Sequence, residues 1–299
     1  MTKYFTLFTV LFLAVKISAS DQSMKPLEVL QISQDSELAS PILLADKTAR
    51  KLYYFSSPDK LNTNEAFEID IGKSGGNKTK RDDHKTPEGI YLLQEKMTQP
   101  QIPFDLYGSL AFTTNYPNVF DKYDNKTGSG IWLHSVPDNV PLNRGSRGCV
   151  VVRNDIIKSL SDKISLNKSY LIINDKTNWV DFKTHSDRKL KIMNWVQNWK
   201  SVWETQNLEP YIKLYSDRFS APGFNKDSWL KHKEKLKKMY QKTSVAMGEP
   251  HIFHQKNQYL VKFVQNYTSD KHQDKGIKTL YLIEENNDLK ILREEWVGL

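Results

Sequence analysis

The stretch that decides the fold runs from residue 130 to residue 152 and reads GIWLHSVPDNVPLNRGSRGCVVV. Two short apolar runs, residues 130–134 and 149–152, flank a loop rich in Pro, Asn, Gly and Ser, so the pattern predicts two β-strands joined by a long loop. His134 ends the first run and Cys149 begins the second. If the two strands are antiparallel neighbours, we expect the imidazole and the thiol to lie close together.

Cys149 is the one cysteine of the chain, which excludes an internal disulfide framework, a Cys-rich zinc site and a CxxC redox centre. Many lone cysteines are inert, buried side chains. Here the neighbouring imidazole would favour the thiolate, and a thiolate beside a base is a nucleophile. The sequence therefore predicts a catalytic pair of Cys149 and His134, with an inert cysteine as the alternative. It predicts no metal and no cofactor, because the other histidines lack ligand spacing.

Short strands dominate the first half of the chain. Residues 42–46 and 51–55 flank a polar turn and predict a hairpin. Further strands are predicted at residues 67–71, 89–93 and 170–173. Many short strands with few helices indicate a β-rich sandwich or barrel-like domain.

The second half changes character near residues 184–188. Apolar side chains recur there at helical spacing and predict an amphipathic helix with a core-facing stripe made of Ile192, Trp195, Trp199 and Trp203. Two more helices and then four strands are predicted at residues 208–219, 229–240, 251–253, 259–264, 278–283 and 289–293. Helices followed by an antiparallel sheet form an α+β domain, so the fold class of the whole chain is α+β.

Residues 1–20 have the three parts of a secretory signal peptide, namely the basic Lys3, an apolar run over residues 4–15 and small residues up to Ser20. The apolar run is shorter than the about 20 residues of a membrane span, and an uncleaved anchor is the alternative. We therefore expect an exported protein that is cleaved near Ser20. Export argues against an intracellular nucleic acid as a partner.

The charge of the chain is unevenly distributed. Cleavage would lower the formal net charge from +8 to +6, because Lys3 and Lys16 would be lost. The whole remaining excess lies in residues 187–299, which hold 20 basic and 14 acidic side chains. The densest basic run lies between Lys231 and Lys242. It is either the solvated face of a helix or a surface that attracts an anionic polymer.

The pattern His134 … Ser146-x-Gly148-Cys149 resembles the signature of the L,D-transpeptidase catalytic domain, also called YkuD-like. Supporting matches cover most of residues 38–178, at Ile71-Gly72-Lys73, Lys85-Thr86-Pro87-Glu88-Gly89, Asn115-Tyr116-Pro117, Gly128-Ser129-Gly130-Ile131-Trp132 and Asn154-Asp155. A His-to-Cys pattern alone is weakly specific. Its combination with Thr-Pro-Glu-Gly, Gly-Ile-Trp-x-His and a signal peptide makes the resemblance strong.

The resemblance implies a peptidoglycan enzyme without a cofactor. Members of the family attack the bond between meso-diaminopimelate and D-Ala in stem tetrapeptides through a Cys thioester. An amine then resolves the thioester into a 3→3 crosslink, or water resolves it into a tripeptide. The implied roles are nucleophile for Cys149 and base for His134, with the carbonyl of Ser135 orienting the imidazole. The N–H groups of Gly148 and Cys149 are implied as oxyanion donors.

Substrate contacts are implied for Tyr116, Ser146 and Arg147. Arg147 stands where the family usually has His, and Val151 stands where it often has Arg. A guanidinium can hold a carboxylate with two parallel hydrogen bonds, so Arg147 is the candidate carboxylate anchor, with a solvated loop arginine as the alternative. Arg153 is a candidate to replace the missing arginine.

Ser-Arg-Gly-Cys followed by a second α+β domain resembles a narrower group, the cell-shape-determining LD-carboxypeptidases of curved Gram-negative bacteria. That group has a C-terminal nuclear-transport-factor-like (SnoaL-like) domain, a fold that often forms dimers. The resemblance implies a catalytic domain at residues 21–186, the second domain at residues 187–299 and a periplasmic location, and it permits a homodimer. It favours an LD-carboxypeptidase that releases D-Ala. The alternatives are an L,D-transpeptidase that forms crosslinks or attaches other amines, and a non-catalytic wall-binding protein.

Overall fold

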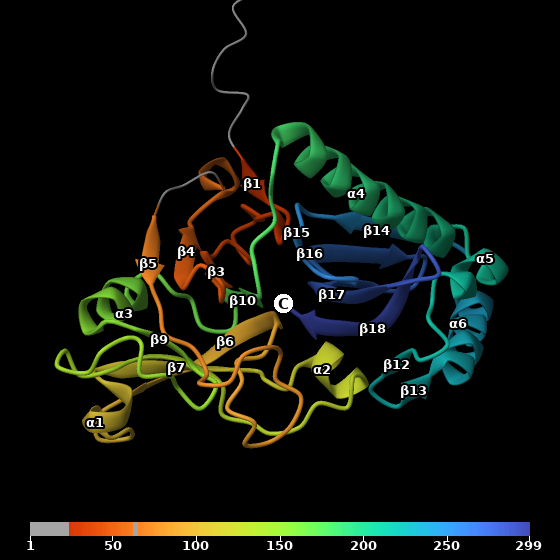
Figure 1. Cartoon of the computed structure of the whole chain (residues 1–299). Helices are drawn as coiled ribbons and strands as arrows, with labels where there is room; N and C mark the ends of the chain where they lie inside the picture. Colours follow the sequence, from red (N-terminus) through yellow and green to blue (C-terminus); the bar gives the residue numbers. More distant parts are fainter. Residues whose placement is uncertain (1–23, 62–64) are drawn as a thin grey trace, which may run out of the picture.

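The computed structural model describes residues 24–61 and 65–299 (Figure 1). The predicted signal peptide, residues 1–20, lies outside the described residues. Within the described part of the chain, no helix is both long enough and apolar enough to cross a membrane. The chain forms two units, each built on one large sheet, and the two units lie against each other.

The first unit is built on an eight-stranded sheet in the order β5-β4-β3-β10-β6-β7-β8-β9. Its strands are β3 (Ile42–Asp46), β4 (Lys51–Phe55), β5 (Ala66–Glu68), β6 (Gly89–Thr98), β7 (Leu110–Thr114), β8 (Trp132–Ser135), β9 (Val150–Val152) and β10 (Tyr170–Asn174). Three short helices accompany the sheet, α1 (Phe104–Tyr107), α2 (Val119–Tyr123) and α3 (Asn154–Ser161). The predicted hairpin is confirmed, because β3 and β4 pair antiparallel.

The central strands β3 and β10 are buried on both faces of this sheet. Successive side chains of a strand point to opposite faces, so Leu43 and Leu171 enter the core that α3 covers, whereas Ile42 and Ile172 enter a second core. That second core also contains Phe253, which belongs to the C-terminal sheet. The two units therefore share one continuous apolar interface.

The strands that flank the His-to-Cys loop are neighbours, as predicted, but they run parallel, with Leu133 of β8 opposite Val150 of β9. The prediction of antiparallel pairing was wrong, because the loop of residues 136–149 is long enough to return the chain to the end of the sheet where β8 begins. This register places Cys149 level with Trp132, at the start of β8. The loop, rather than a tight hairpin, therefore determines where the thiol lies.

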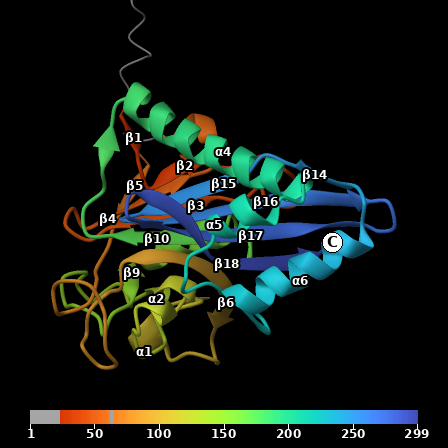
Figure 2. The ribbon, with the colours of Figure 1, turned by 90° about the vertical axis from the view of Figure 1, so that its right-hand side faces the viewer.

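The second unit has a six-stranded sheet in the order β18-β17-β16-β15-β2, with β14 also paired to β16. Its elements are β2 (Val29–Gln31), α4 (Phe182–Glu204), α5 (Leu208–Lys213), α6 (Lys226–Met239), β14 (Thr243–Met247), β15 (His251–Gln255), β16 (Gln258–Ser269), β17 (Gln273–Glu285) and β18 (Asp288–Gly298). Short pairs are formed by β1 (Lys25–Pro26) with β11 (Trp179–Val180) and by β12 (Ser220–Ala221) with β13 (Phe224–Asn225). The three helices lie along one side of the sheet (Figure 2). Trp199 of α4 is fully buried there, as predicted for the tryptophan stripe, whereas Trp203 is half-buried.

The predicted succession of a β-rich unit and an α+β unit is confirmed, but two boundaries differ. The helix expected over residues 208–219 ends as α5 at Lys213, because Tyr215 pairs with Ile291 of β18 instead of continuing the helix. The segment before the first sheet supplies β2 to the C-terminal sheet, where it pairs with β15. The second unit thus includes residues from both sides of the first, and α4 begins five residues before the predicted boundary at residue 187.

Candidate active site

Cys149 lies directly before β9, at the end of the loop that Ser146 and Gly148 help to shape. Gly148 has φ +131°, and a Cβ built on it would lie 2.7 Å from the backbone oxygen of Lys85, so only glycine fits. The Ser146 hydroxyl donates to the Cys149 carbonyl at 2.7 Å and accepts from the Gly148 N–H at 3.0 Å. The loop is therefore closed on itself around Cys149, whose thiol lies 3.5 Å from the carbonyl oxygen of Gly130.

His134 lies on β8 and is almost completely buried. Its Nδ1 lies 2.6 Å from the carbonyl oxygen of Ser135. Because a carbonyl can only accept, Nδ1 carries the hydrogen, and Nε2 is left with its lone pair available as a base. The ring of Tyr107 packs edge-on against the imidazole with the ring centres 5.1 Å apart. These two contacts hold the imidazole in one orientation and one tautomer.

Burial sets the protonation of both groups. It raises the pKa of the Cys149 thiol to about 11 and lowers the pKa of His134 to about 4. At neutral pH the structure therefore holds a neutral thiol and a neutral imidazole. Burial favours the neutral thiol over the resting thiolate that the sequence predicts. The proton must therefore leave the sulfur while the sulfur attacks a substrate.

His134 and Cys149 line the same cavity, which has a volume of about 670 Å³. Five cationic side chains line it with them, and Asp82 is the acidic side chain in the lining; the cations are Lys73, Lys78, Arg81, Arg144 and Arg147. Lys78 is itself buried and pairs with Asp83 at 2.7 Å. A cavity with this excess of positive charge suits a substrate that carries carboxylates.

The predicted site residues do not all reach this cavity. Arg147 and Ser146 line it, as do Cys149 and His134. Tyr116 is buried in the core of the first unit, where its hydroxyl donates to the Thr127 carbonyl at 3.1 Å, and it is not one of the described residues that line the cavity. The ring packs against Tyr91, and the predicted contact of Tyr116 with the substrate stays a prediction.

Two further groups that the sequence analysis singled out form hydrogen bonds within the loop. The Gly148 N–H donates to Ser146 Oγ, and the donor roles of the Gly148 and Cys149 N–H groups toward an oxyanion stay predictions. Arg153, considered as a substitute for a missing arginine, donates to the Val140 carbonyl at 2.6 Å and supports the loop from outside the cavity. Both groups stabilise the loop that carries Cys149.

Sequence reasoning missed Tyr107 and most of the cations. Tyr107 belongs to the helix α1, which has four residues and is therefore too short to show helical periodicity in the sequence. A buried carboxylate was also missed. Asp70 accepts from the Gly145 N–H at 2.6 Å and from Arg50 at 2.6 Å, so it ties the catalytic loop to the chain before β6. The signal available was the alternation of acidic and apolar residues before Gly72.

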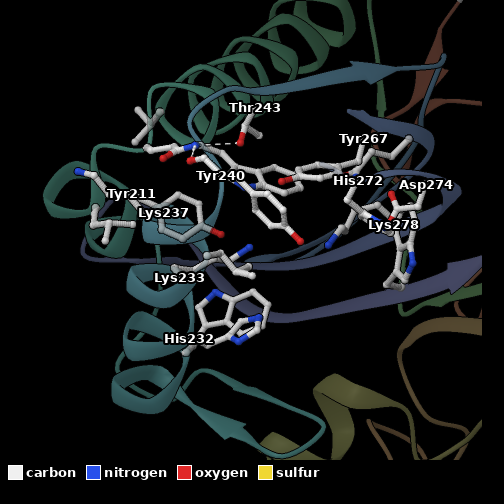
Figure 3. Close-up of a pocket in the computed structure, with 18 residues that line it drawn as sticks. Tyr211, His232, Lys233, Lys237, Tyr240, Thr243, Tyr267, His272, Asp274 and Lys278 are labelled. Carbon is white, nitrogen blue, oxygen red and sulfur yellow. Dashed lines mark hydrogen bonds and ion pairs between the residues drawn. The ribbon is translucent and has the colours of Figure 1, made fainter. Parts of the chain in front are cut away.

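A second cavity, of about 370 Å³, lies in the C-terminal unit between α6 and the sheet. Lys233 of α6 and Lys278 of β17 both reach into it (Figure 3). The Lys233 ammonium lies 4.5 Å from the ring centre of Trp229 and 4.7 Å from that of Trp203, and burial lowers its pKa to about 8. Lys278 pairs with Glu294 at 3.0 Å. In the described residues, no group of three or more His, Cys, Asp or Glu side chains could hold a metal ion.

The chain matches two family models in succession. The model described as the L,D-transpeptidase catalytic domain (YkuD) matches residues 40–180, and the model described as the Cds6 C-terminal NTF2-like domain matches residues 191–295. No curated protein matches the chain.

Solved structures match over almost the whole chain. The structure of Bdellovibrio bacteriovorus Bd1075 is 49% identical with a TM-score of 0.86, and the match covers 92% of this chain and 99% of that chain. The helical cell shape determining protein Pgp2 from Campylobacter jejuni is 24% identical with a TM-score of 0.64, over 86% of this chain and 91% of that chain. A mutant of Pgp2 is 23% identical with a TM-score of 0.69, over 92% of this chain and 94% of that chain. The Pgp2 matches support the two-unit fold.

Proposed function

Since the chain belongs to the L,D-transpeptidase (YkuD) family and carries a C-terminal NTF2-like domain, we propose that it is a periplasmic LD-carboxypeptidase that removes D-Ala from peptidoglycan stem tetrapeptides. The family makes peptidoglycan the substrate. The observation that carries the finer proposal is the single cavity that contains Cys149, His134 and five cationic side chains. The departure of Arg147 from the usual family residue and the appended second unit favour water over an amine as the acceptor.

The first half of the reaction forms a thioester. Cys149 Sγ attacks the carbonyl carbon of the meso-diaminopimelate residue while its proton passes to Nε2 of His134. The bond to the D-Ala nitrogen then breaks, and Nε2 returns the proton to that nitrogen, so that D-Ala leaves as an amine. The hydrogen bond from Nδ1 to the Ser135 carbonyl keeps Nε2 free to accept and return the proton, and it stabilises the imidazolium that forms transiently.

The second half consumes water. His134 Nε2 takes a proton from a water molecule as its oxygen attacks the thioester carbon, the C–S bond breaks, and the sulfur recovers the proton as the thiol. The tripeptide carboxylate and the free enzyme are the products. The substrate offers carboxylates on diaminopimelate and on D-Ala, which Arg147 and Arg144 can hold at the cavity rim.

The test incubates purified protein with tetrapeptide monomers and identifies the products by mass spectrometry. We expect tripeptide monomers and free D-Ala, and neither from a Cys149→Ala variant. Crosslinked 3→3 dimers as the main product would replace the proposal with the transpeptidase alternative. Unchanged tetrapeptide would favour the wall-binding alternative.

A further inference from the structure

One ion-pair cluster joins the C-terminal unit to the wall of the active site. Glu88, only 5% exposed, accepts from Lys47 at 2.7 Å through one carboxylate oxygen and pairs with Lys256 at 2.7 Å through the other. Lys47 is equally buried and belongs to the first unit, whereas Lys256 lies in the turn between β15 and β16 of the second unit. A buried carboxylate is thus held from both units at once.

The Lys256 turn is itself docked on the first unit. Gln255, the last residue of β15 before this turn, donates to Asn174 Oδ1 of β10 at 3.4 Å. Within the second unit, the Lys256 carbonyl accepts from His254 Nε2 at 2.5 Å. Burial alone would raise the pKa of Glu88, but the hydrogen bonds from Lys256 and Lys47 outweigh it and lower that pKa. Glu88 therefore stays ionised and stays bonded to both lysines at neutral pH.

The segment that precedes Glu88 forms the wall behind the catalytic loop. The carbonyl oxygen of Lys85 lies 2.7 Å from the position that a Cβ on Gly148 would occupy, so the two backbones are in close contact. Thr86 accepts from the Gly72 N–H at 2.8 Å, and Gly72 pairs with Ser146 of the loop. A shift of residues 84–86 would therefore move the backbone beside the nucleophile.

Lys47 connects Glu88 to that wall. Besides Glu88, its ammonium donates to the Gly76 carbonyl at 2.9 Å and to the Thr86 carbonyl at 3.5 Å. If Lys256 were removed, one oxygen of a buried carboxylate would lose its partner, and the carboxylate would have to rotate or admit water. Either response changes how Lys47 holds the Thr86 carbonyl.

We propose that Lys256 is a positioning residue that the C-terminal unit contributes to the active site, acting through Glu88 and Lys47 on the backbone behind Gly148. The second unit then takes part in catalysis without touching the substrate. The activity readout rests on the proposed function, and the structural readout does not.

The experiment compares Lys256→Ala, Lys256→Arg and the matched control Lys191→Ala. Lys191 lies on the same unit, is half-exposed like Lys256 and pairs with Glu284 at 3.2 Å instead of with Glu88. Hydrogen exchange followed by mass spectrometry measures the backbone of residues 84–88 and 146–149. Steady-state kinetics on tetrapeptide monomers measure kcat and KM separately.

We expect Lys256→Ala to speed exchange in both segments about tenfold and to lower kcat about fivefold with KM changed less than about twofold. Lys256→Arg restores both values, and Lys191→Ala changes neither. In a Glu88→Gln background, Lys256→Ala has no further effect, because the two side chains act as a unit. If Glu88→Gln does not fold, the comparison of Lys256→Ala with Lys256→Arg still tests whether the positive charge at position 256 positions the backbone.

Unchanged exchange in Lys256→Ala overturns the proposal, and so does faster exchange with an unchanged kcat. An equal loss of kcat in Lys191→Ala overturns it as well, because the effect would then be a general loss of stability. If the wild-type protein does not cleave tetrapeptides, the proposed function fails, whereas the exchange comparison continues to test the role of Lys256.

Discussion

Cys149 should react slowly with iodoacetamide at pH 7, although it is the proposed nucleophile. With a thiol pKa of about 11, about one molecule in ten thousand carries the thiolate at pH 7, against about three in a hundred for a free cysteine. The more basic thiolate is about tenfold more nucleophilic, which offsets part of that difference. We therefore expect alkylation about 30-fold slower than for free cysteine, and a rate that rises about tenfold per pH unit from pH 7 to pH 10.

The control for this prediction is His134→Ala. Because burial lowers the pKa of His134 to about 4, the imidazole is neutral at pH 7 and does not stabilise a resting thiolate. The variant should keep the alkylation rate within about threefold of the wild type while losing two to four powers of ten in kcat, since the general base is gone.

The assay follows the mass increase of the protein over time at several pH values, with free cysteine as the reference. A rate that levels off below pH 9 would show a thiolate stabilised by the site, contrary to the reasoning. A fall of more than about tenfold in His134→Ala would have the same meaning, because it would reveal a resting ion pair between sulfur and imidazole.

Three further predictions concern binding, backbone and pH. Arg147→Ala should raise KM for tetrapeptides about tenfold, and Arg147→Lys should restore KM only in part, because an ammonium cannot make the two-bond contact. Identical kinetics in both variants and the wild type would mean that Arg147 does not bind the substrate. Gly148→Ala should lower the free energy of unfolding by about 3 kcal/mol. The control Gly223→Ala, at φ +80° with open space around it, should lower it by about 1 kcal/mol. Equal losses in urea unfolding would mean that the contact with the Lys85 carbonyl adds no free-energy penalty. Burial lowers the pKa of His251 and of His254 to about 4, so the folded state binds fewer protons than the unfolded state below pH 6.5. The stability that is present above pH 6.5 should therefore fall by about 2 kcal/mol for each histidine between pH 6.5 and pH 5. Urea unfolding midpoints that stay constant over that range would contradict this prediction.

The local elements of this protein follow from its sequence because each is encoded within a few residues. The turn between residues 42–46 and 51–55 and the helical spacing up to Trp199 predict the hairpin and α4 that are observed. The pattern His134 … Ser146-x-Gly148-Cys149 identifies the candidate catalytic residues, because the resemblance to the family rests on which residues occur at that spacing along the chain. The hairpin and the helix depend on short-range sterics and on which face of an element is apolar.

The tertiary structure alone decided how those elements meet. The periodicity of apolar residues predicts that one face of an element is buried, but it does not predict which element covers that face. The sequence therefore could not predict that β8 pairs parallel with β9 or that β2 belongs to the C-terminal sheet. Three of the five cations around the thiol, Lys73, Lys78 and Arg81, come from a separate segment of the chain, and Tyr107 comes from a four-residue helix. The protonation of Cys149 depends on how completely these distant segments exclude water, which is a property of the assembled packing and not of any one stretch of the chain.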